Sequence, residues 1–322
     1  MAQHFLLSAE SRTLSLKEIY KGGEEKAYEA FKRLRWPETK GEPVCPVCGC
    51  VEAKPVANRR TFRCVACNKQ FSVTSGTMFA SRKLSFTDLL AAICLFVNGS
   101  KGMSAVQFSR DLDVQYKTAF VLAHKLREAL AAETVTEMLD GEVEIDGAYF
   151  GGHVRPENRV EDRKDRRRSE NRSERRRVVV ALRQRTGRTL TFIRKSEADG
   201  VEIAKARIAA KAMIFADEAS HWDSLEMHYE TGRINHSVSY SDGNGKHTNM
   251  VESYFSRLRR MVGGQHHHVS HRYLYQYANH AAWLEDHRRR SNGGNAFALL
   301  GGALNHPVSR VWAGYWQRAN AA

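Results

Sequence analysis

The sequence contains no run of 18 uninterrupted apolar residues, which is the length that a membrane-spanning helix requires. Its first residues, MAQHFLLSAESR, lack the charged region, the long apolar stretch and the cleavage site of a signal peptide. No repeat of 20 to 50 residues is evident along the chain. We therefore expect a cytosolic protein that has no membrane partner.

Cysteine is also scarce, and its placement argues against a disulfide framework. Six cysteines occur in 322 residues, and disulfides are rare in cytosolic proteins. Four of the six form two Cys-x-x-Cys pairs, which suggests a bound metal instead. Cys94 lies in the apolar run LLAAICLFV and is expected in the core.

Acidic residues are outnumbered by basic ones. Fifty Lys and Arg against 36 Asp and Glu give a formal net charge of +14. This sign suits a polyanionic partner, and nucleic acid is the first candidate. The alternative is a basic protein without such a partner, since net charge alone does not decide between the two.

The order of local patterns indicates an α/β fold behind two smaller modules. Residues 14–35 carry apolar residues at helical spacing, and Cys, Gly and β-favouring residues then dominate residues 41–79. Three helical segments follow within residues 84–131. After LDGEVEIDGAYF, the β-type runs RRVVVALRQ, RTLTFIRK and KAMIFAD alternate with the helical VEIAKARIAA. Strands that alternate with helices argue for an α/β core.

Residues 155–177 interrupt this core with RPENRVEDRKDRRRSENRSERRR, which is too charged to bury. We expect a basic flexible insert. Either it is a solvated loop without a specific role, or its arginines contact phosphates.

The two cysteine pairs, Cys45 with Cys48 and Cys64 with Cys67, are separated by fifteen residues. This spacing lets two knuckles close a tetrahedron of four thiolates around a structural Zn²⁺. Four sulfurs leave no open position for catalysis, and Cys50 is left out because it follows the turn. Basic residues near the hairpins favour a ribbon that contacts the DNA backbone. The alternative is a ribbon with a purely structural role.

The segment KGMSAVQFSRDLDVQYKTAFVLAHKLREAL predicts a helix-turn-helix, with an ordinary helical hairpin as the alternative. Ser104 is placed to cap the first of its two helices. The second helix begins near Gln115 and would present Gln115, Tyr116, Lys117 and Thr118 to base edges and phosphates.

Three acids fall where they could converge. Asp146 lies on a β-type segment, Asp217 ends an apolar strand, and Glu252 lies on a helix whose apolar positions are Val251, Tyr254, Phe255 and Leu258. Carboxylate oxygens are the ligands that Mg²⁺ prefers, and two such ions about 4 Å apart assist in-line attack on a phosphodiester. Taken singly, each acid is more simply explained as a cap or a surface residue.

Several neighbours of Glu252 are secondary candidates. Asn249 and His247 precede it by about one turn and could orient water, phosphate or the carboxylate. Arg257, Arg259 and Arg260 could hold DNA near the metals, or form a solvated helix face. The run from His266 to His268 is not expected to bind a metal, because adjacent residues cannot all face one ion.

A family resemblance joins these motifs. From about residue 43 to 290 the sequence resembles the ISXO2-like (IS1595 group) insertion-sequence transposases with an RNase H-like DDE core. The motifs that carry the resemblance are CPVCG, CNKQFSVTSGTMF, LFVNGSKGMSAVQFSRDL, IDGAYFGGH, FADEASHWDSL, RINHSVSYSDG and HTNMVESYFSRLRRMVGGQHHHVSHRYLYQYANHAAWLEDHR. By this resemblance Asp146, Asp217 and Glu252 form the catalytic triad. Gly147 stands where the family often has a further acid.

The combined expectation is an α/β protein with an RNase H-like catalytic core, a mixed sheet with helices, preceded by a zinc ribbon and a helix-turn-helix. Its expected parts are a helical lead-in (1–40), the zinc ribbon (41–80), the helix-turn-helix (81–135), the catalytic domain (140–290) and a C-terminal tail (291–322).

The resemblance implies a bacterial, cytoplasmic and nucleoid-associated transposase that binds double-stranded DNA at the element's ends and at the target. Mg²⁺ or Mn²⁺ would serve cleavage and strand transfer. Because two ends must meet, we expect a homodimer or a larger assembly on DNA. The alternatives are a non-catalytic DNA-binding protein and a nuclease that cuts without joining.

Overall fold

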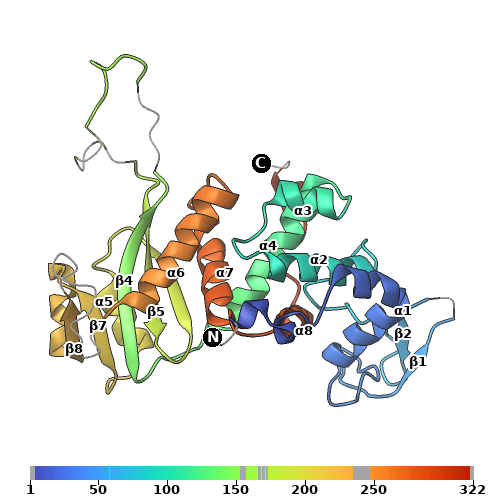
Figure 1. Ribbon diagram of the computed structural model, residues 1–322. Helices are drawn as coiled ribbons and strands as arrows, with labels where there is room; N and C mark the ends of the chain where they lie inside the picture. Colours follow the sequence, from blue (N-terminus) through green and yellow to red (C-terminus); the bar gives the residue numbers. More distant parts are fainter. Residues whose placement is uncertain are drawn as a thin grey trace. The chain divides into compact units, whose positions relative to one another are not determined.

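The computed structural model describes residues 4–57, 59–152, 157–165, 168, 171, 173–234 and 247–319. These residues fold into two compact units (Figure 1). One unit combines Met1–Glu133 with His287–Ala322, and the other consists of Thr134–Asp286. Among the described residues, none of the helices is both long and apolar enough to cross a membrane.

Helices form the framework of the first unit. They are α1 (Leu16–Arg35), α2 (Phe86–Asn98), α3 (Ala105–Asp111), α4 (Tyr116–Ala132), α8 (Asn292–Asn305) and α9 (Tyr315–Ala319). Ser15 and Glu18 form a capping box at the start of α1. Helix α8 packs against α1, α2 and α4. The C-terminal segment therefore contributes to the core of the N-terminal unit.

A small antiparallel sheet completes this unit. Its strands β1 (Ala53–Pro55), β2 (Phe62–Cys64) and β3 (Gln70–Phe71) lie in the order β1-β2-β3. Aromatic side chains join the sheet to the helices, because Trp36 at the end of α1 lies edge-on to Phe62 and Phe71, with ring centroids 5.9 and 6.3 Å apart.

A five-stranded mixed sheet forms the centre of the second unit. Its strands are β4 (Glu142–Phe150), β5 (Arg177–Gln184), β6 (Thr189–Arg194), β7 (Met213–Asp217) and β8 (Glu230–Ile234), in the order β6-β5-β4-β7-β8. Strands β6, β5 and β4 pair in antiparallel fashion, whereas β4, β7 and β8 are parallel. The predicted α/β fold with a mixed sheet is confirmed.

Helices cover both faces of this sheet. Helix α5 (Gly200–Arg207) and the 3₁₀ helix η4 (Ser220–Met227) share an apolar core with alternate residues of β4, β5 and β7. On the other face, α6 (Asn249–Arg260) packs on β4 and β5, and α7 (Leu274–Asp286) packs on β6 and on α6 (Figure 1). A short π-helical turn, η5 (Met261–Gln265), continues α6. The acids expected on the sheet therefore lie between two helical layers.

Candidate catalytic and metal-binding sites

The four cysteines of the two Cys-x-x-Cys pairs converge in the first unit. Their Sγ atoms all lie within 4.8 Å of one another, with 3.6 Å between Cys45 and Cys67 and 3.5 Å between Cys48 and Cys64. Four thiolates about 2.3 Å from a zinc ion form a tetrahedron with edges of about 3.8 Å. The arrangement therefore fits Zn²⁺. Outside the group, the Sγ atom of Cys50 lies 3.6 Å from a backbone carbonyl oxygen.

Each pair lies on a tight turn of the kind that a zinc knuckle needs. The N–H of Gly49 donates to the carbonyl of Cys45 at 2.9 Å, and the N–H of Asn68 donates to that of Cys64 at 3.1 Å. Gly49 and Asn68 have φ of +73° and +57°, a region that these two residue types tolerate well. The N–H of Cys67 donates to the Cys64 sulfur and lowers the pKa of that thiol. The pKa of the Cys48 thiol beside it is raised, so the four thiols share their protons as closely packed metal ligands do.

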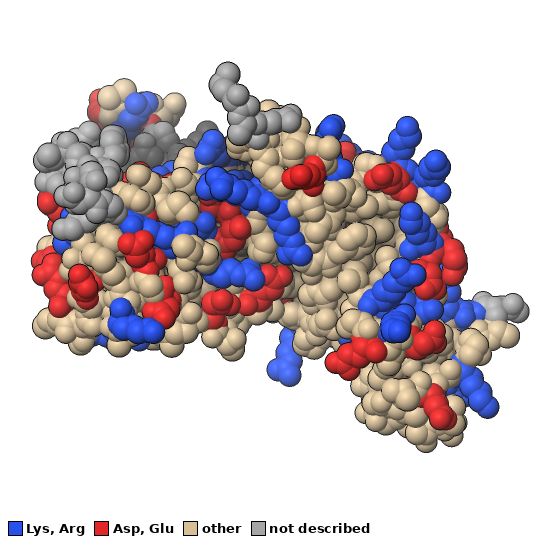
Figure 2. Space-filling view, turned by 60° about the horizontal axis from the view of Figure 1, so that its bottom comes forward, with Lys and Arg blue, Asp and Glu red and all other residues tan. Residues whose placement is uncertain are grey.

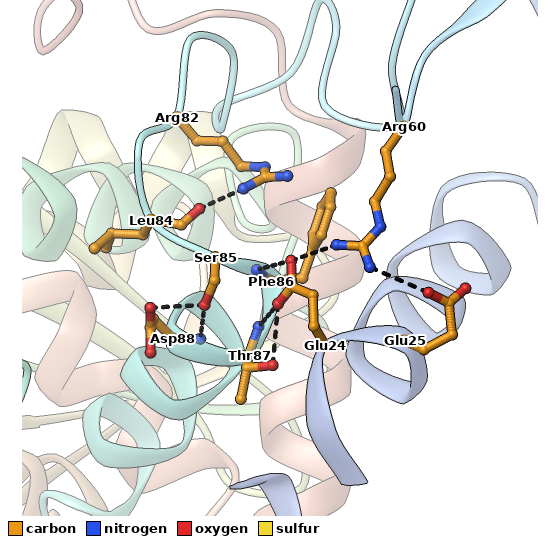
Figure 3. A network of polar contacts seen from close by, with 9 residues as sticks. All are labelled: Glu24, Glu25, Arg60, Arg82, Leu84, Ser85, Phe86, Thr87 and Asp88. Carbon is orange, nitrogen blue, oxygen red and sulfur yellow. Dashed lines mark hydrogen bonds and ion pairs between the residues drawn. The ribbon is translucent and has the colours of Figure 1, made fainter. Parts of the chain in front are cut away.

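A polar network fastens the ribbon to the helices of its unit (Figure 3). Arg60, between β1 and β2, donates to Glu24 at 2.8 Å and to Glu25 at 3.1 Å on α1. Glu24 also accepts the N–H groups of Phe86 and Thr87 in the first turn of α2, at 3.1 and 2.9 Å. Burial alone would raise the pKa of Glu24, but these N–H donors hold it below its ordinary value. One carboxylate therefore joins the ribbon, α1 and α2.

Asp146 and Asp217 lie on neighbouring strands in the second unit. Strands β4 and β7 pair in parallel with Glu144 opposite Phe215, so the same register two residues further along places Asp146 beside Asp217. Ile145 belongs to the core under α5 and η4. Because side chains alternate along a strand, Asp146 faces the opposite side, which α6 covers. The two strand-borne acids thus share a sheet face with the helix of the third.

Helix α6 is anchored to the sheet by Glu144, which is fully buried. Its Oε2 atom accepts the N–H groups of Met250 and Val251 at 2.8 and 2.9 Å. These donors belong to the first turn of α6, where the side chain of the N-cap residue Thr248 caps no backbone N–H and donates instead to Glu252 Oε1 at 3.2 Å. Because Glu252 lies in the same turn, a buried acid on β4 determines where this candidate ligand stands.

Arg185 bonds to the other oxygen of Glu144, and the ring of His247 lies near it. Arg185 Nε lies 2.9 Å from Oε1, and His247 Nδ1 lies 3.1 Å from the same atom. Arg185 also donates to the carbonyl oxygen of His247 at 2.9 Å. His247 is therefore part of the group that holds α6 in place. Asn249, by contrast, is exposed at the start of the helix.

A further acid, Glu197, lies close to Asp146, and sequence reasoning missed it. It belongs to the segment between β6 and α5, and a Cβ atom on Gly147 would come within 2.1 Å of its Oε1 atom. His221 Nε2 lies 4.0 Å from the same oxygen. No motif surrounds Glu197 in the sequence. The one sequence feature that pointed to a neighbour here was Gly147, because a glycine inside a strand often marks a place where another segment approaches closely.

These acids perturb one another's protonation. Burial, followed by the charges of Asp217 and Glu197, raises the pKa of Asp146 to about 7, while the N–H of Gly147 and the charge of Arg259 act in the opposite direction. Burial and the charge of Asp217 likewise raise the pKa of Glu197 to about 7. Crowded carboxylates are stabilised by a cation that replaces their protons.

The carboxylate site is more open than the cysteine site. Within the described residues, the four cysteines are the only group of three or more His, Cys, Asp or Glu residues whose ligand atoms all lie within 4.8 Å of one another. Asp146, Asp217 and Glu252 are each half-buried; the first two lie on the sheet face that α6 covers, and Glu252 lies on α6 itself. Their oxygen donors match the preference of a hard cation such as Mg²⁺.

The three arginines of α6 differ in their surroundings. Arg257 Nε lies 2.9 Å from the buried carboxylate of Glu285 on α7, whereas Arg259 and Arg260 are exposed. The charge of Arg259 lowers the pKa of Asp146. Arg257 therefore joins α6 to α7, Arg259 acts on the acids, and Arg260 bonds to Ser256 of its own helix.

The residues expected to read DNA lie at the start of α4. Ser104 accepts the N–H of Gln107 and caps α3, as predicted from the sequence. The turn before α4 includes Asp113 at a φ of +49°. The four candidates are all exposed at the N-terminal end of α4, namely Gln115, Tyr116, Lys117 and Thr118.

Two family models match the chain. Residues 138–286 match the ISXO2-like transposase domain, and residues 22–70 match the transposase zinc-ribbon domain. The chain belongs to the ISXO2-like (IS1595 group) transposases. No match was found among curated proteins.

Both matches fall on the features already described. In this transposase the DDE domain contains the mixed sheet together with Asp146, Asp217 and Glu252. The zinc-ribbon domain contains most of α1 and all four clustered cysteines. The family resemblance predicted from the sequence motifs is thereby confirmed, as are a DDE domain and a ribbon suited to Zn²⁺.

Proposed function

We propose that this transposase binds the ends of its insertion element, cleaves a DNA strand there and transfers the freed 3′-hydroxyl to target DNA. The observation that carries the proposal is the placement of Asp146 and Asp217 on neighbouring parallel strands, on the sheet face covered by the helix of Glu252. The strand order β6-β5-β4-β7-β8 supports an RNase H-like core.

Asp146, Asp217 and Glu252 are proposed to hold the catalytic Mg²⁺ or Mn²⁺. When bound, such ions activate the attacking oxygen and stabilise the leaving oxygen of a phosphodiester. Asp146 and Asp217 offer ligands from the rigid sheet, and Glu252 offers one from a helix that Glu144 fixes. Exposed Asn249 could orient a water or a phosphate, and His247 is proposed as a positioning residue that acts through Glu144.

DNA binding is assigned to both units. In the first unit, α3 and α4 are proposed as a helix-turn-helix whose exposed Gln115, Tyr116, Lys117 and Thr118 contact DNA. In the second, exposed Arg259 and Arg260 would hold the strand near the acids, and Arg257 supports them through Glu285. Basic side chains are interspersed with acidic ones on the face shown in Figure 2. The proposed DNA contacts therefore depend on where individual basic residues lie, and not on a uniformly positive face.

Because transposition joins two element ends to one target, we propose that the protein acts as a homodimer or a larger assembly on DNA. We expect the cytoplasm, with association to the nucleoid, as its location. The expected basic insert, residues 155–177, lies partly outside the described residues and is left as a prediction.

The test is a cleavage assay on DNA that carries the flanking sequences of the gene. The wild type is compared with Glu252→Gln and with Glu226→Gln, which removes an exposed acid of η4. With Mg²⁺ or Mn²⁺ we expect cut and joined products from the wild type and the control. Glu252→Gln should lose at least about 100-fold of that activity while still binding DNA.

Each other result has a distinct meaning. Binding without cleavage by the wild type would indicate a DNA-binding relic, and cleavage without joining would indicate a nuclease. Equal activity of Glu252→Gln and the wild type would show that the third ligand is misassigned. Glu197→Gln in the same assay tests the additional acid, because a loss of metal affinity there would place Glu197 in the metal site.

A further inference from the structure

The first unit contains a cleft of about 750 Å³ that the proposed recognition residues only partly explain. Its walls come from residues 79–84, from the start of α4 and from residues 312–317 near the C-terminus. The C-terminal segment is held there by aromatic packing, since the ring of His124 on α4 stacks on Trp312 with centroids 4.2 Å apart. Ser309 adds a 2.6 Å hydrogen bond to Glu128 of the same helix.

The charge of this cleft is of one sign. Its lining includes Arg82, Lys83, Lys117 and Lys125, and no acid occurs among the lining residues, all of which are described. Lys125 donates to the carbonyl oxygen of Met78 at 3.0 Å, and burial lowers its pKa. Lys83 and Lys117 are exposed. Four basic side chains and no acid among the lining residues form a favourable site for a polyanion, although the charges of Glu24 and Glu128 act on Arg82 and Lys125 from outside the lining.

Glu24, the acid whose charge acts on Arg82, is already engaged. Figure 3 shows Glu24 bonded to the first turn of α2 and to Arg60, while Arg82 turns to the carbonyl of Leu84. The guanidinium of Arg82 lies 3.6 Å from the ring centroid of Phe86. Arg82 is thus fixed in place, and its charge contributes to the cleft rather than to an ion pair across it.

An aromatic side chain stands beside these charges. Trp316 donates from Nε1 to the carbonyl oxygen of Lys117 at 3.3 Å, and Lys117 Nζ lies 5.3 Å over the indole ring. The indole therefore lies next to the first turn of α4, where the proposed DNA-contacting residues begin. Cations together with an aromatic face are the groups that bind the phosphates and the sugars or bases of a nucleic acid strand.

We propose that this cleft binds the DNA strand next to the bases that α4 reads, with Lys83 and Lys117 on phosphates and Trp316 against a sugar or base. The proposal rests on the proposed DNA-binding function and adds the C-terminal segment to it. The cleft is too large for a single phosphate and has no acid to bind a basic partner, so a nucleic acid strand suits it best.

The test measures binding of the full-length, zinc-loaded protein to a duplex that carries the gene's flanking sequence, at several salt concentrations. Lys83→Ala should weaken binding about 3- to 10-fold and reduce the slope of log K against log salt by about 1, because one phosphate contact is lost. Lys17→Ala is the matched control, since Lys17 is exposed on α1 and outside the cleft.

Trp316 supplies a second readout. Trp316→Ala should weaken binding about 5- to 100-fold, and Trp316→Phe should retain most of the affinity because a ring remains. DNA should quench less tryptophan fluorescence in Trp316→Phe than in the wild type. Zinc content and circular dichroism check that each variant is folded.

The outcomes distinguish failure of the proposed function from failure of the cleft proposal. If the wild type binds no DNA, the proposed function falls, and the cleft proposal falls with it. If the wild type binds but Lys83→Ala matches Lys17→Ala in affinity and salt slope, and Trp316→Phe shows unchanged quenching, the cleft proposal is overturned while the proposed function stands.

Discussion

Glu144 on β4 accepts the N–H of Val251 on α6 at 2.9 Å, so that a fully buried carboxylate caps the helix that carries Glu252. The charge of the acid is balanced on its other side by Arg185, 2.9 Å away. A carboxylate at a helix N-terminus also interacts favourably with the helix dipole. The position of the third proposed ligand thus depends on an acid that is not itself proposed to bind metal.

Replacement of Glu144 should therefore be costly. We expect Glu144→Gln to lower the free energy of unfolding of the second unit by roughly 3 kcal/mol, because Arg185 would be left without its buried partner. Glu142 is the matched control, since it lies 3.3 Å from the same arginine but its side chain is 54% exposed. Glu142→Gln should cost less than about 1 kcal/mol. Equal costs in denaturant unfolding would contradict the assigned role of Glu144.

Removal of zinc should unfold the ribbon without unfolding the second unit. The folded ribbon has only short strands around its sulfurs, so metal binding supplies much of its stability. Cys48→Ser should lose the ion and make residues 41–80 sensitive to protease, and DNA binding should weaken. Cys50→Ser should keep one zinc per chain by elemental analysis. Loss of zinc from Cys50→Ser would show that the ligand set is wrong.

The capping role of Glu24 leads to a prediction in the first unit. Glu24→Ala should cost about 1–2 kcal/mol, because two N–H groups of α2 lose their acceptor. Since the pKa of Glu24 is lowered, its contribution is present at neutral pH and is lost as the pH falls below about 4.5. Hydrogen exchange at the amides of Phe86 and Thr87 should report the change. Glu25→Ala, at a side chain that is 72% exposed, should leave that exchange unaltered.

The acids Asp146 and Glu197 of the second unit should change stability with pH in the opposite direction from Glu24. The pKa values of Asp146 and Glu197 are raised to about 7, so both acids are more easily protonated in the folded chain than in the unfolded chain. In metal-free protein, stability should consequently fall as the pH rises from about 4 to 7, by at most about 1.4 kcal/mol per pH unit for each carboxylate. Thermal unfolding at several pH values measures this trend.

Two comparisons test whether these acids cause the fall in stability between about pH 4 and 7. Asp146→Asn should flatten the decline, because it removes a carboxyl whose ionisation is opposed by burial and by the charges of Asp217 and Glu197, and added Mg²⁺ should restore stability mainly above pH 7. A decline that is the same in Asp146→Asn and in the wild type would place its origin outside this group of acids.

The convergence of the four cysteines and the sheet face of Asp146 could be predicted because each depends on residues close together in the sequence. A Cys-x-x-Cys turn brings two sulfurs together by itself, and the alternation of a strand assigns Asp146 to a face without reference to the rest of the fold. The apolar positions of α6 likewise identify its buried side, since Val251, Tyr254, Phe255 and Leu258 are all buried.

Other features were decided only by tertiary structure. Glu197 is far from Asp146 in the sequence and approaches it because the chain leaves β6 beside Gly147. Glu144 has the pattern of a second acid near Asp146, and only the packing of α6 shows that it caps a helix. The proposed DNA cleft depends on Trp316 reaching the first turn of α4 from the C-terminal segment. Local patterns determine helices, strands and knuckles, whereas contacts between distant segments depend on which faces pack together, and that is a property of the whole fold.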